Sequence, residues 1–394
     1  MSMPLPAQAP APTSVGELAS DFDIDIFDSL DAATPAWRWL EARGVLTPYQ
    51  RRDWIAAYLA AFSPAGRVQV LLLSHNGAPA ALFPFHIVNR FGVRIAQTIG
   101  MPISNGDAPV FDPGFSDRLG VEALRAAFRR LPADLVNFHC VAPRIGGRDN
   151  PLLGFAHAPA PDHFYFNELA PGDIPYIEQA LPHKRRTNIK RSQRRLSEGF
   201  GEVRLKAAQS EQEVRDLLAI FLDQRGRRFA AMGVENIFAQ AEFRAFFERL
   251  AVESLSQPRP ALRIHALYAG ERVIATSLGA YGPSHYSQYI NSTDDGEPSR
   301  FSLMGVTLSL LVDELRREGI VGLDMGLGDF DYKLDWTHKT VVYDIVIANS
   351  ALGLFARPVL IGLRRGKRAI KQTPALWRAA RAVQGLKLKL KRQK

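Results

Sequence analysis

The sequence predicts an α/β fold of the α+β type, with a mixed β-sheet flanked by helices in each of two halves and a basic helical tail. Three observations support this prediction. Strand and helix patterns are interspersed along the chain, each half presents them in the same order, and 394 residues exceed what one hydrophobic core usually spans.

The first half is organised around a hairpin whose turn is Asn76-Gly77. This dipeptide between two apolar runs is typical of a two-residue hairpin turn. The other elements expected in this half are a strand at 22–27, helices near 35–43, 48–62 and 119–130, and a strand at 135–140. Hairpins combined with helical connections predict a mixed sheet rather than a purely parallel one.

The second half repeats this plan around a hairpin with Gly270 in its turn. Its other expected elements are a strand at 202–206, helices near 211–224, 240–255 and 301–317, and a strand at 320–325. A Gly/Pro-rich run at 142–163 separates the halves. The expected divisions are a disordered leader at 1–20, domains at 21–160 and 161–350, and a tail at 351–394.

Composition excludes several classes of protein. With 46% hydrophobic and 23% charged residues, the chain resembles ordinary soluble proteins, and it has no apolar run of about 18 residues that predicts a membrane-spanning helix. The first 20 residues lack the basic and apolar segments of a secretory signal. The single cysteine, Cys140, excludes an internal disulfide and is expected to be a buried structural thiol in a reducing cytoplasm.

The net charge of +9 comes from the tail. Residues 351–394 hold thirteen Lys or Arg and no Asp or Glu, so the other 350 residues carry a net charge of −4. Leu360, Ile361 and Trp377 lie among these cations, a composition typical of a helix on an anionic membrane surface. A solubilising tail without a partner and a nucleic-acid contact are the alternatives.

A second basic cluster lies at 184–195. Arg186 and Lys190 share one helical face with Arg194, and this face suits phosphates, an acidic glycan or RNA. A solvated surface fits the same pattern.

The segment from Gly319 to Trp336 holds the densest group of chemically active side chains. Its strand alternates apolar residues with Asp324, which places a carboxylate beside sheet backbone, and two glycines then allow a sharp turn. The residues after the turn add carboxylates, a phenol, an ammonium and an indole: Asp329, Asp331, Tyr332, Lys333, Asp335 and Trp336. This mixture indicates ligand recognition, although a solvated loop with Trp336 in the core fits as well.

The helix expected at 301–317 begins beside a polar segment. The N–H groups of a helix start bind anions, so this one is a candidate pyrophosphate site. The residues expected to form it are Ser299, Arg300, Ser302, Leu303, Met304 and Gly305.

Together these pieces resemble the Gcn5-related acyltransferase (GNAT) superfamily, in particular its tandem branch with bacterial cellulose-biosynthesis-type and Fem-like transferases. The resemblance covers about 182–347 and rests on KRRTNIKRSQRRL, QRGRRFAAMG, GERVIATSLGAY and FSLMGVTLSLLVDELRREGIVGLDMGLGDFDYKLDW. It implies two tandem GNAT-like domains, the first a degenerate partner. It also implies coenzyme A at Ser299 to Gly305, where Ser302-Leu303-Met304-Gly305 stands in place of the usual Gln/Arg-x-x-Gly-x-Gly/Ala loop.

The resemblance implies an N- or O-acyltransferase that uses acetyl-CoA or a longer acyl-CoA. The acceptor would be an amine or hydroxyl of a sugar, a lipid or a cell-envelope or exopolysaccharide intermediate. Asp324 is then expected to act as base or to position the acceptor, Tyr332 to protonate the departing thiolate and Lys333 to hold an anionic acceptor. The acceptor-binding residues expected are Trp336, Asp329, Arg186 and Lys190.

Two other functions remain open: a non-catalytic polysaccharide-assembly or binding module, and an aminoacyl-tRNA-dependent Fem-like ligase that binds RNA through 184–195. His265 and His285 are further candidate bases by residue type. Scattered histidines and one cysteine predict no metal site, and no G-x-S-x-G elbow marks a nucleophilic serine. The expected location is the cytoplasm, with the tail available to the inner face of the membrane.

Overall fold

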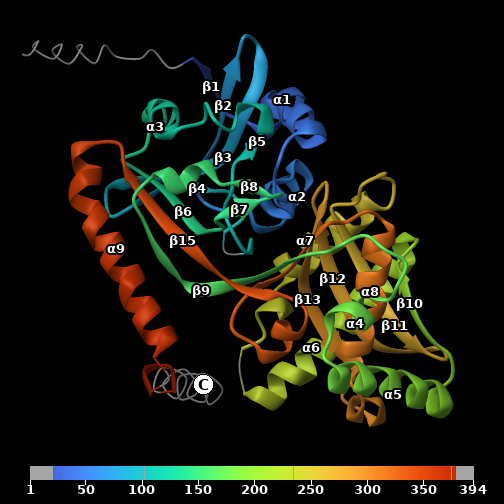
Figure 1. The fold of residues 1–394 in the computed structure, drawn as a ribbon. Helices are drawn as coiled ribbons and strands as arrows, with labels where there is room; N and C mark the ends of the chain where they lie inside the picture. The colour runs from blue at the N-terminus through green and yellow to red at the C-terminus, as the bar shows by residue number, and fades with distance from the viewer. Residues whose placement is uncertain (1–20, 102, 234, 374, 379–394) are drawn as a thin grey trace, which may run out of the picture.

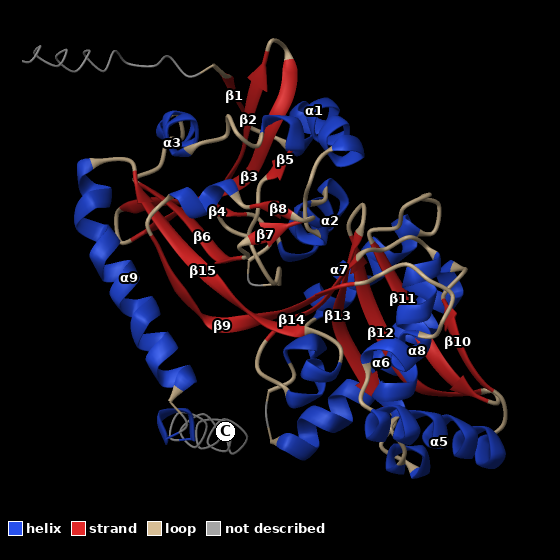
Figure 2. Cartoon of the chain, viewed as in Figure 1, coloured by secondary structure: helices blue, strands red, loops and turns tan. Residues whose placement is uncertain are grey.

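The computed structural model describes residues 21–101, 103–233, 235–373 and 375–378; the leader predicted at 1–20 and the tail after 378 lie outside them. Within the described residues, helices flank one 13-stranded mixed sheet (Figures 1 and 2). The prediction of an α/β fold with a mixed sheet is confirmed.

The N-terminal half follows the predicted order of elements. Its helices and strands are β1 (Asp23–Phe27), α1 (Leu30–Arg43), η1 (Pro48–Gln50), α2 (Arg52–Phe62), β2 (Arg67–His75), β3 (Ala78–Arg90), β4 (Val93–Thr98), β5 (Val110–Phe111), η2 (Pro113–Phe115), α3 (Val121–Arg129), β6 (Leu135–Val141), β7 (Arg144–Ile145), β8 (Arg148–Asp149) and η3 (Pro151–Gly154). Asn76 and Gly77 take positive φ angles of 50° and 77° between β2 and β3, which confirms the predicted hairpin turn.

The C-terminal half repeats the sequence of a strand, two helices, an antiparallel sheet, a helix and a strand. Its elements are α4 (Tyr176–Ala180), α5 (His183–Phe200), β10 (Val203–Ala207), α6 (Glu211–Met232), η4 (Ile237–Ala239), α7 (Ala241–Ser254), β11 (Leu262–Ala269), β12 (Arg272–Tyr281), β13 (His285–Thr293), η5 (Glu297–Arg300), α8 (Leu303–Arg317), β14 (Gly322–Leu327) and η6 (Asp331–Asp335). The duplicated plan is therefore present in the folded chain.

Several predicted boundaries are wrong by a few residues or more. α1 begins at Leu30, five residues before the predicted start. α6 continues to Met232, eight residues beyond the prediction, and ends where Gly233 adopts a left-handed conformation. α8 begins at Leu303 because the segment before it forms the separate 3₁₀ turn η5. β14 starts two residues later than predicted, because Ile320 still bonds back to Leu315 at the end of α8.

Two strands cross between the halves. β9 (His157–Glu168) follows the N-terminal half but pairs with β14, whereas β15 (His338–Ala348) follows the C-terminal half but pairs with β6. β9 and β15 also pair with each other, so the sheet order is β1-β2-β3-β4-β6-β15-β9-β14-β13-β12-β11-β10. Each half is thus completed by a strand from the other. The boundary predicted near residue 160 falls within β9 and stays a prediction.

The two halves also share a hydrophobic core. Trp54 of α2 packs edge-to-face on Phe246 of α7 and on Tyr289 of β13, with ring centroids 4.9 and 5.3 Å apart. These rings are buried or nearly so, and burial of such large apolar side chains is the dominant stabilising contribution in folded proteins. The halves are therefore packed as one body.

The predicted helical tail is present as far as it is described. α9 (Ala351–Gln372) starts at Ser350, whose hydroxyl caps the helix by accepting from the Gly353 N–H, and runs beside β9 and β15 (Figure 1). Among the described helices, none combines the length and apolar character needed to cross a membrane.

Candidate active site

β13 and β14 are parallel neighbours whose pairing is short. It runs from the pair His285–Gly322 to the pair Ser287–Asp324 and stops there, although both strands continue. Gly326, with a φ of +67°, turns β14 away immediately beyond this point. The strands therefore diverge at Asp324.

Asp324 is fully buried where the strands part. Its carboxylate accepts hydrogen bonds from the Ser287 hydroxyl at 2.6 Å and from the Gly326 N–H at 2.8 Å, and it contacts His285 Nε2. Three donors compensate for the loss of water around this charge. Because Asp324 is fully buried, its carboxylate is placed to orient His285 rather than to contact an acceptor directly.

His285 carries the reactive nitrogen of this pair. Its ring stacks on Phe166 of β9 with centroids 5.7 Å apart, and the side chain is 10% exposed. The Asp324 carboxylate holds the proton on Nε2, which leaves the Nδ1 lone pair available. Among the described residues, no hydrogen-bond partner occupies Nδ1, so this nitrogen is able to accept a proton.

The N-terminal half closes over the same pair of strands. Tyr49 of η1 shares a hydrogen bond of 2.5 Å with the Ser287 hydroxyl and accepts one of 2.6 Å from Asn105 Nδ2. Burial, followed by the nearby Asp324 charge, raises the pKa of Tyr49 well above its ordinary value, so the phenol stays neutral. A hydrogen-bond network from both halves thus fixes Asp324 and, through it, His285.

A cavity of about 410 Å³ opens beside His285, between the halves. Strands β9, β13 and β15 line it with Phe164, Phe166, Asn167, Glu168, His285, His338 and Thr340. The N-terminal half supplies the other residues, Thr47, Tyr49, 106–108, Cys140 and 142–147. His285 belongs to the lining whereas Asp324 does not, so a ligand in this cavity would meet the imidazole.

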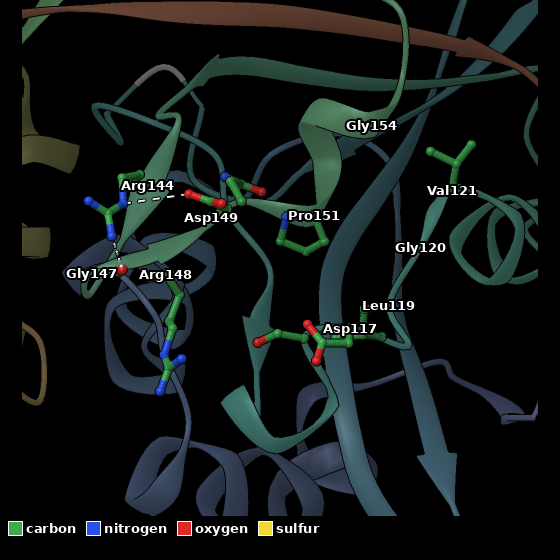
Figure 3. A pocket seen from close by; sticks show the side chains of 12 residues that line it. Asp117, Leu119, Gly120, Val121, Arg144, Gly147, Arg148, Asp149, Pro151 and Gly154 are labelled. Carbon is green, nitrogen blue, oxygen red and sulfur yellow. Dashed lines mark hydrogen bonds and ion pairs between the residues drawn. The ribbon is translucent and has the colours of Figure 1, made fainter.

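A second cavity, of about 530 Å³, lies in the N-terminal half between α3 and the β7–β8 hairpin (Figure 3). Its charged lining residues include Asp117, Arg148 and the ion pair of Arg144 with Asp149, whose nitrogen and oxygen are 3.5 Å apart. The Asp149 side chain is 96% exposed. These solvated charges give the second cavity no group comparable to His285.

Asp107 is a buried carboxyl in the lining of the first cavity. Burial raises its pKa to about 7, although a hydrogen bond of 2.7 Å from the His139 N–H and the charge of Arg364 oppose the shift. Between the ordinary value of 3.8 and about 7, the folded chain holds a proton that the unfolded chain has lost. The free energy of unfolding therefore falls as pH rises through this window.

We expect Asp107→Asn to remove this dependence on pH. Relative to the unchanged chain, the variant should gain stability between about pH 4 and pH 8, by at most about 4 kcal/mol, because the buried amide never ionises. Urea unfolding across this pH range measures the difference. The exposed carboxylate of Asp149 provides the control Asp149→Asn, and parallel pH profiles for Asp107→Asn and the unchanged chain would contradict the prediction.

Lys333 was predicted to hold an anionic acceptor, but its side chain packs against the backbone of the turn after β14. Its ammonium donates to the carbonyls of Leu327 at 2.7 Å and Gly328 at 3.0 Å, and burial lowers its pKa to about 8. Asp329, predicted to bind the acceptor, accepts a hydrogen bond of 2.7 Å from the Tyr165 hydroxyl. These contacts fix the turn, and neither residue lines the cavity.

Tyr332 and Trp336 also lie apart from His285. Tyr332 packs against the core of the C-terminal half, and burial raises its pKa. Trp336 is 1% exposed and stacks on Tyr176 with centroids 6.1 Å apart, inside the core of the C-terminal half. Of the predicted catalytic residues, the structure brings only Asp324 next to the cavity-lining histidine.

The start of α8, predicted to bind pyrophosphate, lacks a capping side chain. Ser302 precedes the helix without capping it, and its N–H donates to Ser192 of α5 at 3.2 Å. A β-carbon on Gly305 would approach Ile189 Cγ1 of α5 to 2.9 Å, so glycine allows the close packing of α8 on α5. A helix start without a side-chain cap fits an anionic ligand.

The charges near this helix start are basic and partly compensated. Arg300 pairs with Glu297 at 2.9 Å, and on α5 both Arg186 and Lys190 pair with Glu178. The predicted acceptor contacts of Arg186 and Lys190, and the pyrophosphate contacts of Ser299, Leu303 and Met304, stay predictions. No group of three or more metal-ligating side chains occurs in the described part of the chain.

The N-terminal half contains a counterpart of this strand pair without its chemistry. β4 and β6 also pair in parallel over a short stretch, which ends at Gln97 and Asn137, as β13 and β14 end at Ser287 and Asp324. An amide thus takes the place of the carboxylate. Arg364 of α9 donates to the Asn137 side chain at this position. The expectation of a degenerate partner domain stays a prediction.

No pattern in the sequence marks Tyr49, Asn105 or Ser287 as members of the candidate site. Tyr49 lies 238 residues from Ser287 along the chain, so no local pattern links them. His285 is a candidate by residue type. It is the first residue of β13, and the parallel pairing of β13 with β14 brings it to Asp324.

Comparison with known proteins supports the observed fold. Residues 183–334 match the family model of the acetyltransferase (GNAT) domain. The chain is similar to FemX (TM-score 0.58, 10% identity, 84% of this chain and 99% of that chain) and to a conserved protein of unknown function from Bacteroides thetaiotaomicron (0.51, 10%, 82% and 99%). A tandem GNAT protein from the clavulanic acid biosynthesis pathway is also similar (0.40, 9%, 83% and 99%). No curated protein matches the sequence.

Proposed function

Because the chain carries a GNAT acetyltransferase domain at residues 183–334, we propose that it transfers an acyl group from acyl-coenzyme A to an amine or hydroxyl bound beside His285. The observation that supports this proposal most directly is the buried pair of His285 and Asp324. A histidine that is held by a carboxylate and lines a cavity is the arrangement that general-base catalysis requires.

The reaction needs a base because the acceptor loses a proton when it attacks the thioester. A new C–N or C–O bond forms at the acyl carbon, the C–S bond breaks, and the coenzyme leaves as a thiol. His285 Nδ1 takes the proton of the acceptor, and the imidazolium then gives this proton to the departing thiolate sulfur. Asp324 keeps the ring in place and stabilises the imidazolium that results.

The start of α8 is the part of this chain best suited to the coenzyme. Its N–H groups lack a side-chain cap, and exposed cations of α5, among them Arg191 and Arg195, lie on the helix that packs against it. Contacts of a pyrophosphate with these groups would hold the donor. Beyond Ser287 and Asp324 the facing edges of β13 and β14 are not paired with each other, so their backbone groups are available to the rest of the coenzyme.

The cavity limits the size of the acceptor. A volume of about 410 Å³ suits a sugar-sized molecule or the head of a larger intermediate. Phe164 and Phe166 offer apolar surface, whereas Glu168 and His338 offer polar groups. We therefore propose a sugar, a lipid or a cell-envelope intermediate as the acceptor. We also propose that the reaction takes place in the cytoplasm.

Binding of the donor provides the test of this proposal. Acetyl-CoA or a longer acyl-CoA at about 100 times its Kd should stabilise the native chain by about 2.7 kcal/mol, which raises Tm by a few degrees. Differential scanning fluorimetry of the full chain with acyl-CoA of increasing chain length measures this shift. Free coenzyme A controls for the pyrophosphate alone.

The alternative functions predict different results. No shift with any acyl-CoA, together with tRNA binding that weakens steeply with salt, would favour aminoacyl transfer. No shift together with polysaccharide binding would favour a non-catalytic module.

A further inference from the structure

α9 is attached to the rest of the chain by its cations. Lys371 pairs with Asp162 of β9 at 2.7 Å, Arg368 donates to the Ala160 carbonyl, and Arg364 donates to the Phe138 carbonyl at 3.3 Å. The helix, which runs beside β9 and β15 in Figure 1, therefore turns a polar, basic face toward the sheet.

The opposite face of α9 is apolar and exposed. Leu352, Phe355, Val359, Leu363 and Ile370 are 48%, 80%, 64%, 69% and 42% exposed. Their spacing of three, four, four and seven residues places them on one stripe of the helix. A surface helix normally buries such a stripe against the core. α9 has the opposite orientation, because its basic face lies toward the sheet and its apolar stripe faces outward. Leu360 and Ile361, which the sequence also suggested for a membrane contact, are half-buried instead.

The exposed stripe ends in a hollow of about 580 Å³. Its lining residues are Gly362, Leu363, Gly366, Lys367, Ile370, Lys371 and Trp377. The two glycines leave the helix backbone open between the larger apolar side chains. A continuous apolar surface of this kind on a folded protein marks a contact with another apolar surface.

Charge indicates which surface this is. Arg365 and Lys367 are exposed on α9, and the sequence after residue 372 adds seven further cations without an acidic residue: Arg378, Arg381, Lys387, Lys389, Lys391, Arg392 and Lys394. Pairing the stripe with that of a second copy would bring two such cationic segments together, which repulsion opposes. A nucleic acid would neutralise the positive charge but leave the apolar stripe exposed to water. An anionic lipid bilayer would neutralise the positive charge and also bury the apolar stripe.

We propose that α9 lies on the surface of an anionic phospholipid membrane, with the stripe Leu352, Phe355, Val359, Leu363 and Ile370 inserted among the acyl chains. Arg365 and Lys367 then meet the lipid headgroups. The inward cations keep the helix attached to the sheet, so the whole chain is held at the membrane. This inference is independent of the proposed acyl transfer.

Vesicle flotation with the full chain tests the proposal. We expect binding to phosphatidylcholine vesicles that contain about 30% phosphatidylglycerol, and binding at least about tenfold weaker to phosphatidylcholine alone. The triple variant Phe355→Ser, Val359→Ser, Leu363→Ser should bind the anionic vesicles about tenfold more weakly or worse. Its Tm should stay close to that of the unchanged chain, because these side chains are exposed.

Ile174 provides a matched control, because it is 60% exposed in the loop before α4, which packs on α8 in the C-terminal half. Ile174→Ser should bind vesicles as the unchanged chain does. Three results would overturn the proposal: no binding by the unchanged chain, equal binding by the triple variant, or a dimer in light scattering that the triple variant dissociates. The last result would identify a second copy as the occupant of the stripe.

Discussion

Replacement of His285 by Gln is expected to lower kcat/KM for acyl transfer by about 10²- to 10⁴-fold, the usual contribution of a general base. Gln keeps a polar side chain against Asp324 but has no nitrogen able to take the proton of the acceptor. Release of the coenzyme thiol, in the presence of amine and hydroxyl acceptors, measures the rate. Donor binding should persist, because the predicted coenzyme site lies at the start of α8, so the acyl-CoA shift in Tm is the accompanying readout.

Asp324→Asn should reduce the same rate by about 10²-fold or more, since an amide cannot hold the imidazole in the required tautomer or stabilise its charged form. His265→Gln is the matched control. His265 is likewise a buried histidine paired with a carboxylate, Glu314 at 3.3 Å, but it lies on β11 outside the cavity lining. Equal losses for His285→Gln and His265→Gln would show that the effect is structural and would remove His285 from the mechanism.

Replacement of Arg51 by Ala is expected to destabilise the chain by about 3–5 kcal/mol, because it breaks a buried polar network. Arg51 precedes α2 in the N-terminal half and is 8% exposed. Its guanidinium donates to carbonyls of the C-terminal half at Arg259, Pro260 and Tyr281, over distances of 2.9, 2.7 and 3.2 Å. Alanine would leave these acceptors without their partner in the shared interface.

The neighbouring residue provides the control for this prediction. Arg52 pairs with Asp31, whose side chain is 92% exposed, and with Thr34 at 2.7 Å, both within the N-terminal half. Arg52→Ala should cost about 1 kcal/mol or less, as expected for a pair with an exposed partner. Urea unfolding of both variants decides the matter, and similar losses for Arg51→Ala and Arg52→Ala would argue against a role for Arg51 in joining the halves.

The order of elements was predictable because each depends on local information. The Asn76-Gly77 turn, the apolar period of α8 and the glycine Gly319 after it act over a few residues, and the duplicated plan follows from reading such signals in sequence. The coarse position of the site was predictable for a similar reason. A carboxylate in a strand followed by glycines is a local feature, and Asp324 does lie where β13 and β14 part.

The distribution of roles within the candidate site was not predictable. Lys333 and Trp336 are close to Asp324 in sequence, yet the turn after β14 directs the former to backbone carbonyls and the latter into the core. His285 and Tyr49, by contrast, are distant in sequence and meet Asp324 or its partner Ser287 through strand pairing and packing of the halves.

The sequence by itself determined the mixed α/β elements, their repetition in two halves and a basic tail, because periodicity, turn residues and charge are properties of short segments. Only the tertiary structure decided that β9 and β15 cross between the halves, that His285 of β13 meets Asp324, and that α9 turns its cations inward and its apolar stripe outward. Such facts depend on which surfaces meet after the chain closes on itself, and the free energy of those contacts is shared by residues hundreds of positions apart.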